Sequence, residues 1–270
     1  MEALRQVDEW PVEQPAVAAI GETVATRGPE DRAYDWASVT KLVTALAVLV
    51  AAEEGILDLD EPAGPPRSTV RHLLAHASGL PLDEGAPIAR PATRRIYSNA
   101  GYEQLAELVG DRAEMPFADY LAQAVLRPLG MKTELAGSPA SGLRGTIHDL
   151  GLLGAFLLSG QPPLVADETL REATSVQFRG LVGVLPGYGR LEPNDWGLGF
   201  ELRDEKRPHW TGEHNSSRTF GHFGQSGSFV WVDPDAGVAC VCLTDARFGD
   251  WAKQAWPALS DAVLAEYRRA

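Results

Sequence analysis

The sequence is poor in cysteine and in long apolar runs, and both shortages narrow the kind of protein it encodes. Its 270 residues include only two cysteines, Cys240 and Cys242, which stand one residue apart. Alternate positions of a strand point to one face, so these thiols are expected to be reduced core residues rather than a disulfide. Two thiols without a nearby histidine also cannot complete a zinc site. The longest apolar stretch, residues 42–52, is shorter than the roughly 20 residues that cross a bilayer.

The sequence also has fewer basic residues than acidic ones. The chain has 24 Lys and Arg against 37 Asp and Glu, which gives a formal net charge of −13. Such acidity repels phosphate backbones and anionic lipids, so neither nucleic acid nor a membrane surface is an expected partner. Residues 1–11 carry acids where an export signal carries bases, and no apolar run follows them. We therefore expect a cytoplasmic protein, whose oligomeric state the sequence does not indicate.

The pattern of apolar residues predicts helices at both ends and in the middle of the chain. Helices are expected over residues 2–9, 38–54, 70–75, 102–109, 117–126, 146–158 and 250–268, the last with a kink or restart at Pro257. Strands are expected over residues 16–20, 23–26, 197–203, 219–223, 228–232 and 238–243, of which the last is apolar throughout and should be central. The strands therefore come from the two chain ends. This predicts an α/β lobe from residues 1–57 and 195–270, a mainly helical lobe from residues 58–194, and an active site in the cleft between them.

A Ser-x-x-Lys motif opens the helix expected at residues 38–54. On a helix, Ser38 and Lys41 share one face about one turn apart, so the lysine amine can reach the serine hydroxyl. Free N–H groups at a helix start favour developing negative charge, and a neighbouring base activates a weak nucleophile. The structural alternative is a serine that caps the helix while the lysine points into solvent. The rest of this helix is apolar and offers Lys41 little solvent, which weakens that alternative.

Two further triplets supply candidate partners. Tyr97 and Asn99 form a Tyr-x-Asn motif, in which a phenol can relay protons and an amide can hold a carbonyl or orient the lysine. His222 and Gly224 form a His-x-Gly motif on an expected strand. Each triplet also has a structural explanation: a turn asparagine after an edge tyrosine, and a packed strand histidine before a glycine that permits close approach.

In combination and in this order, the triplets resemble those of the penicillin-recognising serine hydrolases. The likeness is to the class C β-lactamase-like branch, which includes family VIII esterases, DD-peptidases and D-aminopeptidases. Residues 72–80 (HLLAHASGL), 97–102 (YSNAGY), 125–131 (VLRPLGM) and 221–228 (GHFGQSGS) carry it along nearly the whole chain. The resemblance implies a β-lactamase-like α/β fold, with an antiparallel sheet flanked by terminal helices and an inserted helical lobe.

The resemblance also implies roles by position. Ser38 would be the acylated nucleophile, Lys41 the general base and Tyr97 the proton shuttle to the leaving group. Lys41 and Tyr97 could act as one coupled unit, and which of them is the resting base stays open. Asn99 would position Lys41 and the substrate carbonyl. The backbone N–H groups of Ser38 and Gln225 would form the oxyanion hole, and no metal or organic cofactor is implied.

The third triplet departs from the lactam-cleaving members in a way that affects the substrate. Those members usually carry Lys-Thr-Gly or Lys-Ser-Gly where this chain has His222, Phe223 and Gly224. Gly224 would still let the strand approach the substrate. A neutral imidazole and a phenyl ring bind a carboxylate less well than an ammonium and a hydroxyl. We therefore expect a small-molecule substrate, most readily a carboxylic ester, with weaker hydrolysis of β-lactams or D-amino-acid amides.

Several alternatives remain open at this point. The chain could be a β-lactamase or a DD-/D-aminopeptidase proper, or a non-catalytic ligand-binding protein that keeps the fold. Ser226 lies in a segment superficially similar to that of trypsin-like proteases, but the helical middle of the chain disfavours a double β-barrel. His72 and His76 are four residues apart without a third ligand in view, so a packing or capping role is expected rather than zinc.

Overall fold

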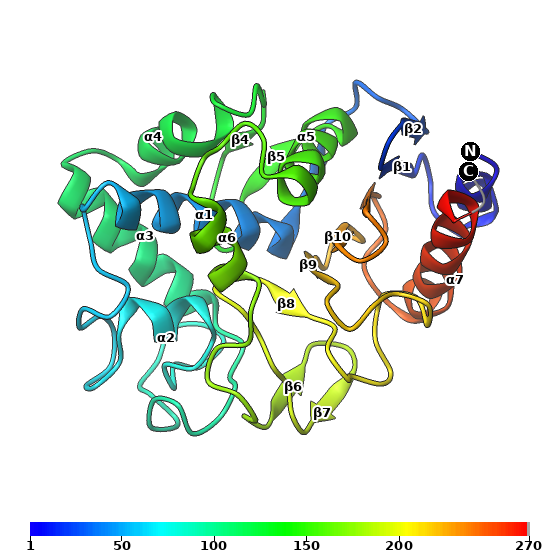
Figure 1. The fold of residues 1–270 in the computed structure, drawn as a ribbon. Helices are drawn as coiled ribbons and strands as arrows, with labels where there is room; N and C mark the ends of the chain where they lie inside the picture. The colour runs from blue at the N-terminus through cyan, green and yellow to red at the C-terminus, as the bar shows by residue number, and fades with distance from the viewer. Residues whose placement is uncertain (269–270) are drawn as a thin grey trace.

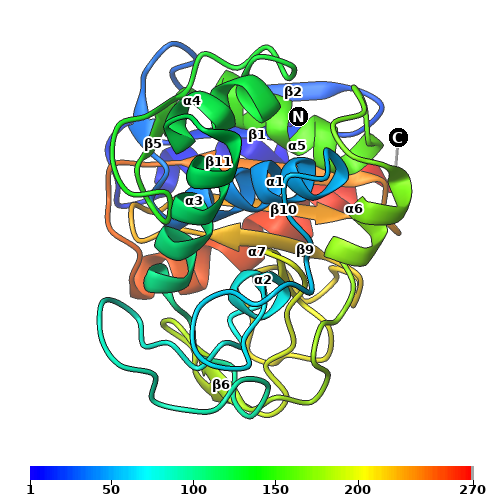
Figure 2. The same ribbon diagram turned by 90° about the vertical axis from the view of Figure 1, so that its left-hand side faces the viewer.

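The computed structural model describes residues 1–268 and contains a six-stranded antiparallel sheet between two layers of helices (Figures 1 and 2). In spatial order its strands are β2 (Val24–Arg27), β1 (Ala16–Ile20), β11 (Val238–Leu243), β10 (Phe229–Asp233), β9 (Phe220–Phe223) and β8 (Glu201–Leu202). The apolar strand β11 lies inside the sheet, as predicted, between β1 and β10. The two ends of the chain together build this sheet.

Alternation along the central strands divides the core into two layers. Cys240 and Cys242 point to the face covered by η1 (Ala3–Glu9) and α7 (Asp250–Tyr267), and both are buried and free, as predicted. Val241 points to the opposite face, which is covered by α5 (Ile147–Ser159). The two layers thus share one sheet, and Figure 1 shows α7 and the N-terminal segment on the opposite side from α1 and α3–α5.

The remaining elements are helix α1, which is nearly fully buried, and those that surround it or extend from it toward the loops at the bottom of Figure 2. They are β3 (Tyr34–Asp35), η2 (Ala37–Val39), α1 (Thr40–Glu53), α2 (Val70–Leu74), α3 (Asn99–Ala113), α4 (Phe117–Leu121), the π-helical turn η3 (Ala122–Leu126), β4 (Glu134–Leu135), β5 (Leu143–Gly145), α6 (Asp167–Ala173), β6 (Gly183–Leu185) and β7 (Gly189–Leu191). Among residues 1–268, none of the helices combines the length and apolar composition of a membrane span.

Three predicted helices differ from the structure in their limits. The helix expected from residue 38 starts as the single 3-10 turn η2 and becomes α-helical at Thr40, because Ala37 before it has a left-handed φ of 45°. α3 begins at Asn99 instead of residue 102, since the Ser98 side chain caps it by accepting a hydrogen bond from the Gly101 N–H at 3.0 Å. The helix expected over residues 117–126 divides into α4 and η3.

Other differences follow from packing. Of the two outcomes predicted at Pro257, the restart is wrong, because α7 continues through this residue, whereas the kink stays a prediction. One lost backbone hydrogen bond is offset by the buried stripe that holds α7 on the sheet. The strand expected over residues 197–203 shrinks to Glu201–Leu202, since Gly199 has a φ of +91° and packs closely against Ala45. The division into lobes at residues 57 and 195 stays a prediction, although α5 from the middle segment packs on the sheet.

Candidate active site

Ser38 lies on the turn η2, which is held between two strands of different sheets. The Trp36 N–H donates to the Leu143 carbonyl at 2.9 Å, beside β5. The Trp36 carbonyl accepts a hydrogen bond from the Ser228 hydroxyl at 2.7 Å, beside β10. A left-handed alanine, Ala37, follows directly. Backbone strain of this kind persists only where surrounding contacts fix it, so Ser38 is presented in one defined position.

Lys41 lies one turn into the helix and has no exposed surface. Its Nζ donates to Asn99 Oδ1 at 2.7 Å and to the Ala140 carbonyl at 2.9 Å. Burial lowers the pKa of Lys41 to about 7, although the carboxylates of Glu103 and Asp83 act in the opposite direction. A neutral amine has two N–H donors and one lone pair. Because both donors have partners, the lone pair is left for a third direction, and the amine can accept a proton near neutral pH.

Tyr97 brings a phenol to the same place. The Lys41 Nζ lies 4.7 Å from the centre of the Tyr97 ring. Burial raises the pKa of Tyr97, and a hydrogen bond with the Ser38 side chain only partly offsets this effect. The Tyr97 hydroxyl also lies 3.5 Å from His222 Nε2. The structure therefore brings Ser38, Lys41, Tyr97 and His222 together, with Tyr97 as a protonated phenol at neutral pH.

Asn99 is held by contacts on both sides of its amide. Its Oδ1 faces Lys41, and its Nδ2 donates to Asp83 Oδ1 at 3.0 Å. Asp83 lies in an exposed loop, and the neighbouring Leu82 carbonyl accepts from the Asn99 backbone N–H at 2.6 Å. These bonds fix which end of the amide faces the lysine. Asp83 and the Ala140 carbonyl were absent from the sequence prediction, because neither lies in a motif and a backbone carbonyl leaves no signal in the sequence.

His222 is buried on β9 and is uncharged. Its Nδ1 lies 2.7 Å from the Phe223 carbonyl, so Nδ1 carries the proton and Nε2 is an acceptor. Burial, with the positive charge of Lys41, lowers the pKa of His222 to about 3. Phe223, by contrast, is only 5% exposed and packs against Phe248, Trp210 and Trp256. The side chain at this position therefore belongs to the core and presents almost no surface to a substrate.

Gly224 and Gln225 lie where β9 meets the Ser38 turn. A Cβ on Gly224 would stand 2.5 Å from Ser228 Oγ and 2.6 Å from the Trp36 carbonyl oxygen, so only glycine fits without a shift. The Gln225 carbonyl accepts from the Phe248 N–H at 3.0 Å. Within residues 1–268 no hydrogen bond uses the Gln225 N–H. This donor follows Gly224, which contacts the two residues that precede Ser38.

The remaining candidates of the sequence take separate partners. His72 Nδ1 lies 2.8 Å from the Thr69 hydroxyl, whereas His76 Nδ1 accepts from the Ser98 N–H at 3.1 Å. The Ser226 hydroxyl donates to the Ser228 hydroxyl at 3.1 Å. Over the described part of the chain, no group of three or more His, Cys, Asp or Glu residues is arranged to hold a metal.

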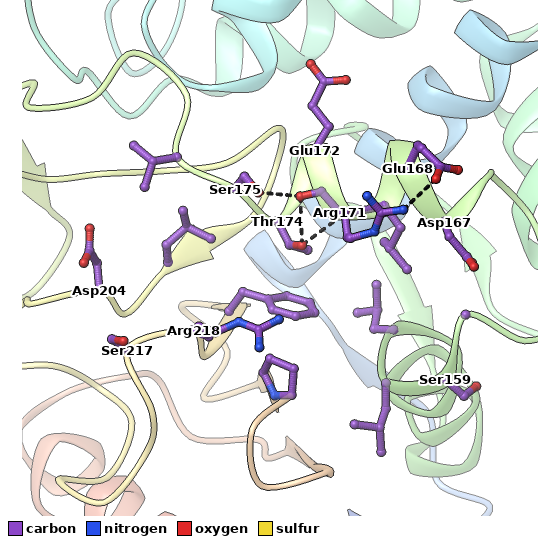
Figure 3. A pocket seen from close by; sticks show the side chains of 18 of the residues that line it. Ser159, Asp167, Glu168, Arg171, Glu172, Thr174, Ser175, Asp204, Ser217 and Arg218 are labelled. Carbon is purple, nitrogen blue, oxygen red and sulfur yellow. Dashed lines mark hydrogen bonds and ion pairs between the residues drawn. The ribbon is translucent and has the colours of Figure 1, made fainter.

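A groove of about 990 Å³ lies elsewhere on the surface, between α6 and the segment before β9 (Figure 3). None of the predicted site residues lines it. Four of its charged side chains are paired, Arg171 with Glu168, Glu172 with Arg71 and Arg218 with Asp235. The groove is therefore separate from the cluster around Ser38.

This chain is similar to known proteins along most of its length. A family model described as Beta-lactamase matches residues 16–136 and 132–264. The chain belongs to the β-lactamase family. A crystal structure of a β-lactamase from Mycobacterium bovis is 55% identical, with a TM-score of 0.96 over 98% of this chain and 99% of that one. These matches confirm both the predicted family and the predicted fold of this β-lactamase family member, whose relatives are serine hydrolases.

More distant relatives share the fold of this β-lactamase family member. Unliganded simvastatin synthase from Aspergillus terreus is 15% identical, with a TM-score of 0.79 over 98% of this chain and 97% of that one. The penicillin-binding protein homologue from Pyrococcus abyssi is 18% identical, with a TM-score of 0.74 over 97% of this chain and 74% of that one. Penicillin-binding protein 4* of Bacillus subtilis (strain 168) is 29% identical over 131 residues, which is 36% of this chain. The match spans only 29% of that curated relative's length.

Proposed function

We propose that this chain is a serine hydrolase that forms an acyl-enzyme at Ser38 and acts most readily on carboxylic esters with short acyl groups. The observation that carries the proposal is the state of Lys41, which is wholly buried, has both donors of its neutral form bonded, and has a pKa lowered to about 7. A lysine confined to a structural role gains nothing from such desolvation. Tyr97 has a raised pKa, so Lys41 rather than Tyr97 is the resting base.

The reaction then follows from the placement of the groups. Lys41 takes the proton of Ser38 while the serine oxygen attacks the ester carbonyl, and the N–H groups of Ser38 and Gln225 hold the oxyanion. Tyr97 donates its proton to the departing alkoxide and regains one from Lys41. Water then attacks the acyl carbonyl while Lys41 accepts its proton, the bond to Ser38 Oγ breaks, and the serine oxygen regains a proton from Tyr97, which Lys41 reprotonates. The products are the free acid and the alcohol, and the enzyme returns to its starting state.

His222 supports esters over β-lactams as the favoured substrates. Its Nδ1 proton is committed to the Phe223 carbonyl, so the atom that faces Tyr97 is an unprotonated Nε2. A lone pair repels a substrate carboxylate, whereas an ammonium at this position would attract it. A neutral ester has no carboxylate and does not need a cation at this position. EstCE1, whose fold is similar, is a hydrolase with promiscuous acyltransferase activity, which is consistent with acyl chemistry on this scaffold.

The first test is hydrolysis of p-nitrophenyl butyrate by the wild type and by Ser38→Ala. We expect turnover by the wild type and a loss of about 10³-fold or more in the variant, because the nucleophile is gone. Circular dichroism and thermal melting of both proteins check the fold. Nitrocefin is assayed in parallel, and faster turnover of nitrocefin than of every ester tried would overturn the ester preference. Equal inactivity of both proteins would favour a non-catalytic ligand-binding protein.

A further inference from the structure

His76 lies directly behind the Tyr97–Asn99 segment and holds it by two hydrogen bonds. The His76 carbonyl accepts from the Ile96 N–H at 2.9 Å, and its ring Nδ1 accepts from the Ser98 N–H at 3.1 Å. These two bonds lie on either side of Tyr97 in the sequence. The His76 side chain is buried, with 1% of the residue exposed. It follows that the backbone which carries Tyr97 is anchored to one histidine.

The ring of His76 also fixes the Tyr97 side chain. Its centre lies 4.6 Å from that of Tyr97, 5.2 Å from that of Tyr102 and 4.8 Å from that of Trp196, the last at an interplanar angle of 89°. Trp196 in turn packs on Tyr97 and His222, with centres 5.8 Å and 5.5 Å away. A buried ring enclosed in this way cannot rotate without moving its neighbours. The phenol of Tyr97 therefore takes its position from His76.

Two unfavourable features of His76 persist in spite of their cost. Because the Ser98 N–H donates to Nδ1, the ring proton must be on Nε2. Nε2 is buried and has no hydrogen-bond partner among residues 1–268. The backbone of His76 also has a left-handed φ of 53°, which is uncommon for residues other than glycine. Unfavourable conformations of this kind are kept only where many surrounding contacts fix them. Such positions are common at functional sites.

We propose that His76 is a positioning residue, which holds the Tyr97 phenol at Ser38 and the Asn99 amide at Lys41 by bonding the backbone and packing the ring. The inference rests on the proposed function, because the geometry it maintains is that of the acyl-transfer site. His76 itself does not touch the reacting atoms. Its ring stays neutral, since burial and the nearby charges of Lys41 and Arg95 hold its pKa well below the ordinary value.

The test uses two variants of His76 and one of its neighbour. In His76→Asn, the side-chain oxygen can replace Nδ1 as acceptor and the residue tolerates the left-handed backbone, whereas His76→Ala removes both the acceptor and the ring. We expect kcat for p-nitrophenyl butyrate to fall about 10²-fold in the alanine variant and about tenfold or less in the asparagine variant, with KM changed less than about threefold. His72→Asn, in the same segment but bonded to Thr69, should stay within about twofold of wild type.

Nuclear magnetic resonance supplies a readout independent of turnover. The histidine ¹⁵N signals should show a protonated Nε2 and an unprotonated Nδ1 for His76 in the folded wild type. The Tyr97 ring signals, assigned with Tyr97→Phe, should shift in His76→Ala and stay in place in His72→Asn. An active wild type with full kcat in folded His76→Ala, a protonated Nδ1, or unmoved Tyr97 signals would each overturn the positioning role. A wild type that hydrolyses no ester, with these spectra as expected, would overturn the proposed function alone.

Discussion

The charge on Lys41 depends on the balance between burial and two carboxylates at its periphery. Burial disfavours the ammonium, whereas Glu103 and Asp83 favour it. Asp83 has a second effect, because it holds the Asn99 amide that accepts a hydrogen bond from Lys41. This exposed residue thus links the solvent to a base that has no exposed surface itself.

Replacing Asp83 should shift the pH dependence of catalysis in a defined direction. The reaction requires neutral Lys41, so kcat/KM should rise as the pH increases through about 7. Asp83→Asn keeps an acceptor for Asn99 but removes the charge that stabilises the ammonium. The amine then loses its proton at lower pH, and the activity at pH 6 should increase about twofold to threefold at low ionic strength.

The control for this profile is Asp111→Asn, which removes a charge from the far end of α3, where the residue is exposed. Its acidic limb should match that of the wild type when kcat/KM is measured from pH 5 to 9. An unchanged limb in Asp83→Asn, or the same shift in both variants, would contradict a specific effect of Asp83 on Lys41. High salt should reduce the difference, because exposed charges are screened.

At the scale of secondary-structure elements, the active site depends on how closely β9 approaches the turn η2. Gly224 is the contact point, since a Cβ there would stand 2.6 Å from the Trp36 carbonyl oxygen and 3.0 Å from the Ala37 Cβ. The Gln225 N–H follows immediately. Its distance from Ser38 is therefore set by the absence of a side chain at position 224.

Gly224→Val should separate the strand from the turn. Removing one oxyanion donor typically costs about 10²–10³-fold in kcat, and we expect a loss of this order with p-nitrophenyl butyrate. Gly151→Ala on α5 is the matched control, because nothing lies within 4 Å of the added Cβ. It should leave kcat unchanged and stabilise the protein by about 0.5–1 kcal/mol in urea denaturation. Full activity in folded Gly224→Val would show that Gln225 is not an oxyanion donor.

Elements also show where sequence patterns succeed and where they fail. β1, β11, α5 and the burial of α1 are predicted well, since long apolar runs leave few alternatives. α6 was missed, because it buries only Ala173 and has no apolar stripe. The first turn of α3 was missed because its stability comes from the Ser98 cap rather than from periodicity. Motifs predicted Ser38, Lys41, Tyr97 and Asn99, whereas the contacts of His76 and Asp83 depend on tertiary structure.

Over the whole molecule, a second buried polar cluster lies behind the active site. Glu201 on β8 is 1% exposed and contacts the Lys206 ammonium, with His209 Nε2 and Trp210 Nε1 each 2.8 Å from its Oε2. The Lys206 Nζ lies 5.7 Å from the centre of the Trp196 ring, which packs on His222. Burial opposes the ionisation of Glu201, but His209 and Lys206 outweigh that effect and lower its pKa to about 2.

Removing Glu201 should destabilise the whole fold. Glu201→Gln leaves the buried Lys206 without its counter-charge, and the free energy of unfolding at pH 7 should fall by about 3–5 kcal/mol in urea denaturation. The folded-state pKa lies below the ordinary 4.5, so the contribution is complete above that pH and is lost toward pH 2. The difference in unfolding free energy between wild type and Glu201→Gln should therefore become smaller as the pH falls toward 2.

Glu192→Gln serves as the control, because the Arg190–Glu192 pair is 69% and 70% exposed. Its effect should stay below about 1 kcal/mol at every pH. A Glu201→Gln variant as stable as Glu192→Gln would mean that the buried cluster contributes little to the fold.

The pairing of β1 with β11 has a consequence for synthesis. Ala16 lies opposite Leu243, so β1 is synthesised 227 residues before its central neighbour in the sheet. At about 5–20 residues per second, the wait on the ribosome is roughly 10–45 s. Until then the apolar strand β1 can pair within the sheet only with β2, so the nascent chain passes through a long interval in which this strand can bind chaperones or other chains. Closure of the sheet must therefore wait until β11, which lies between β1 and β10, has been synthesised.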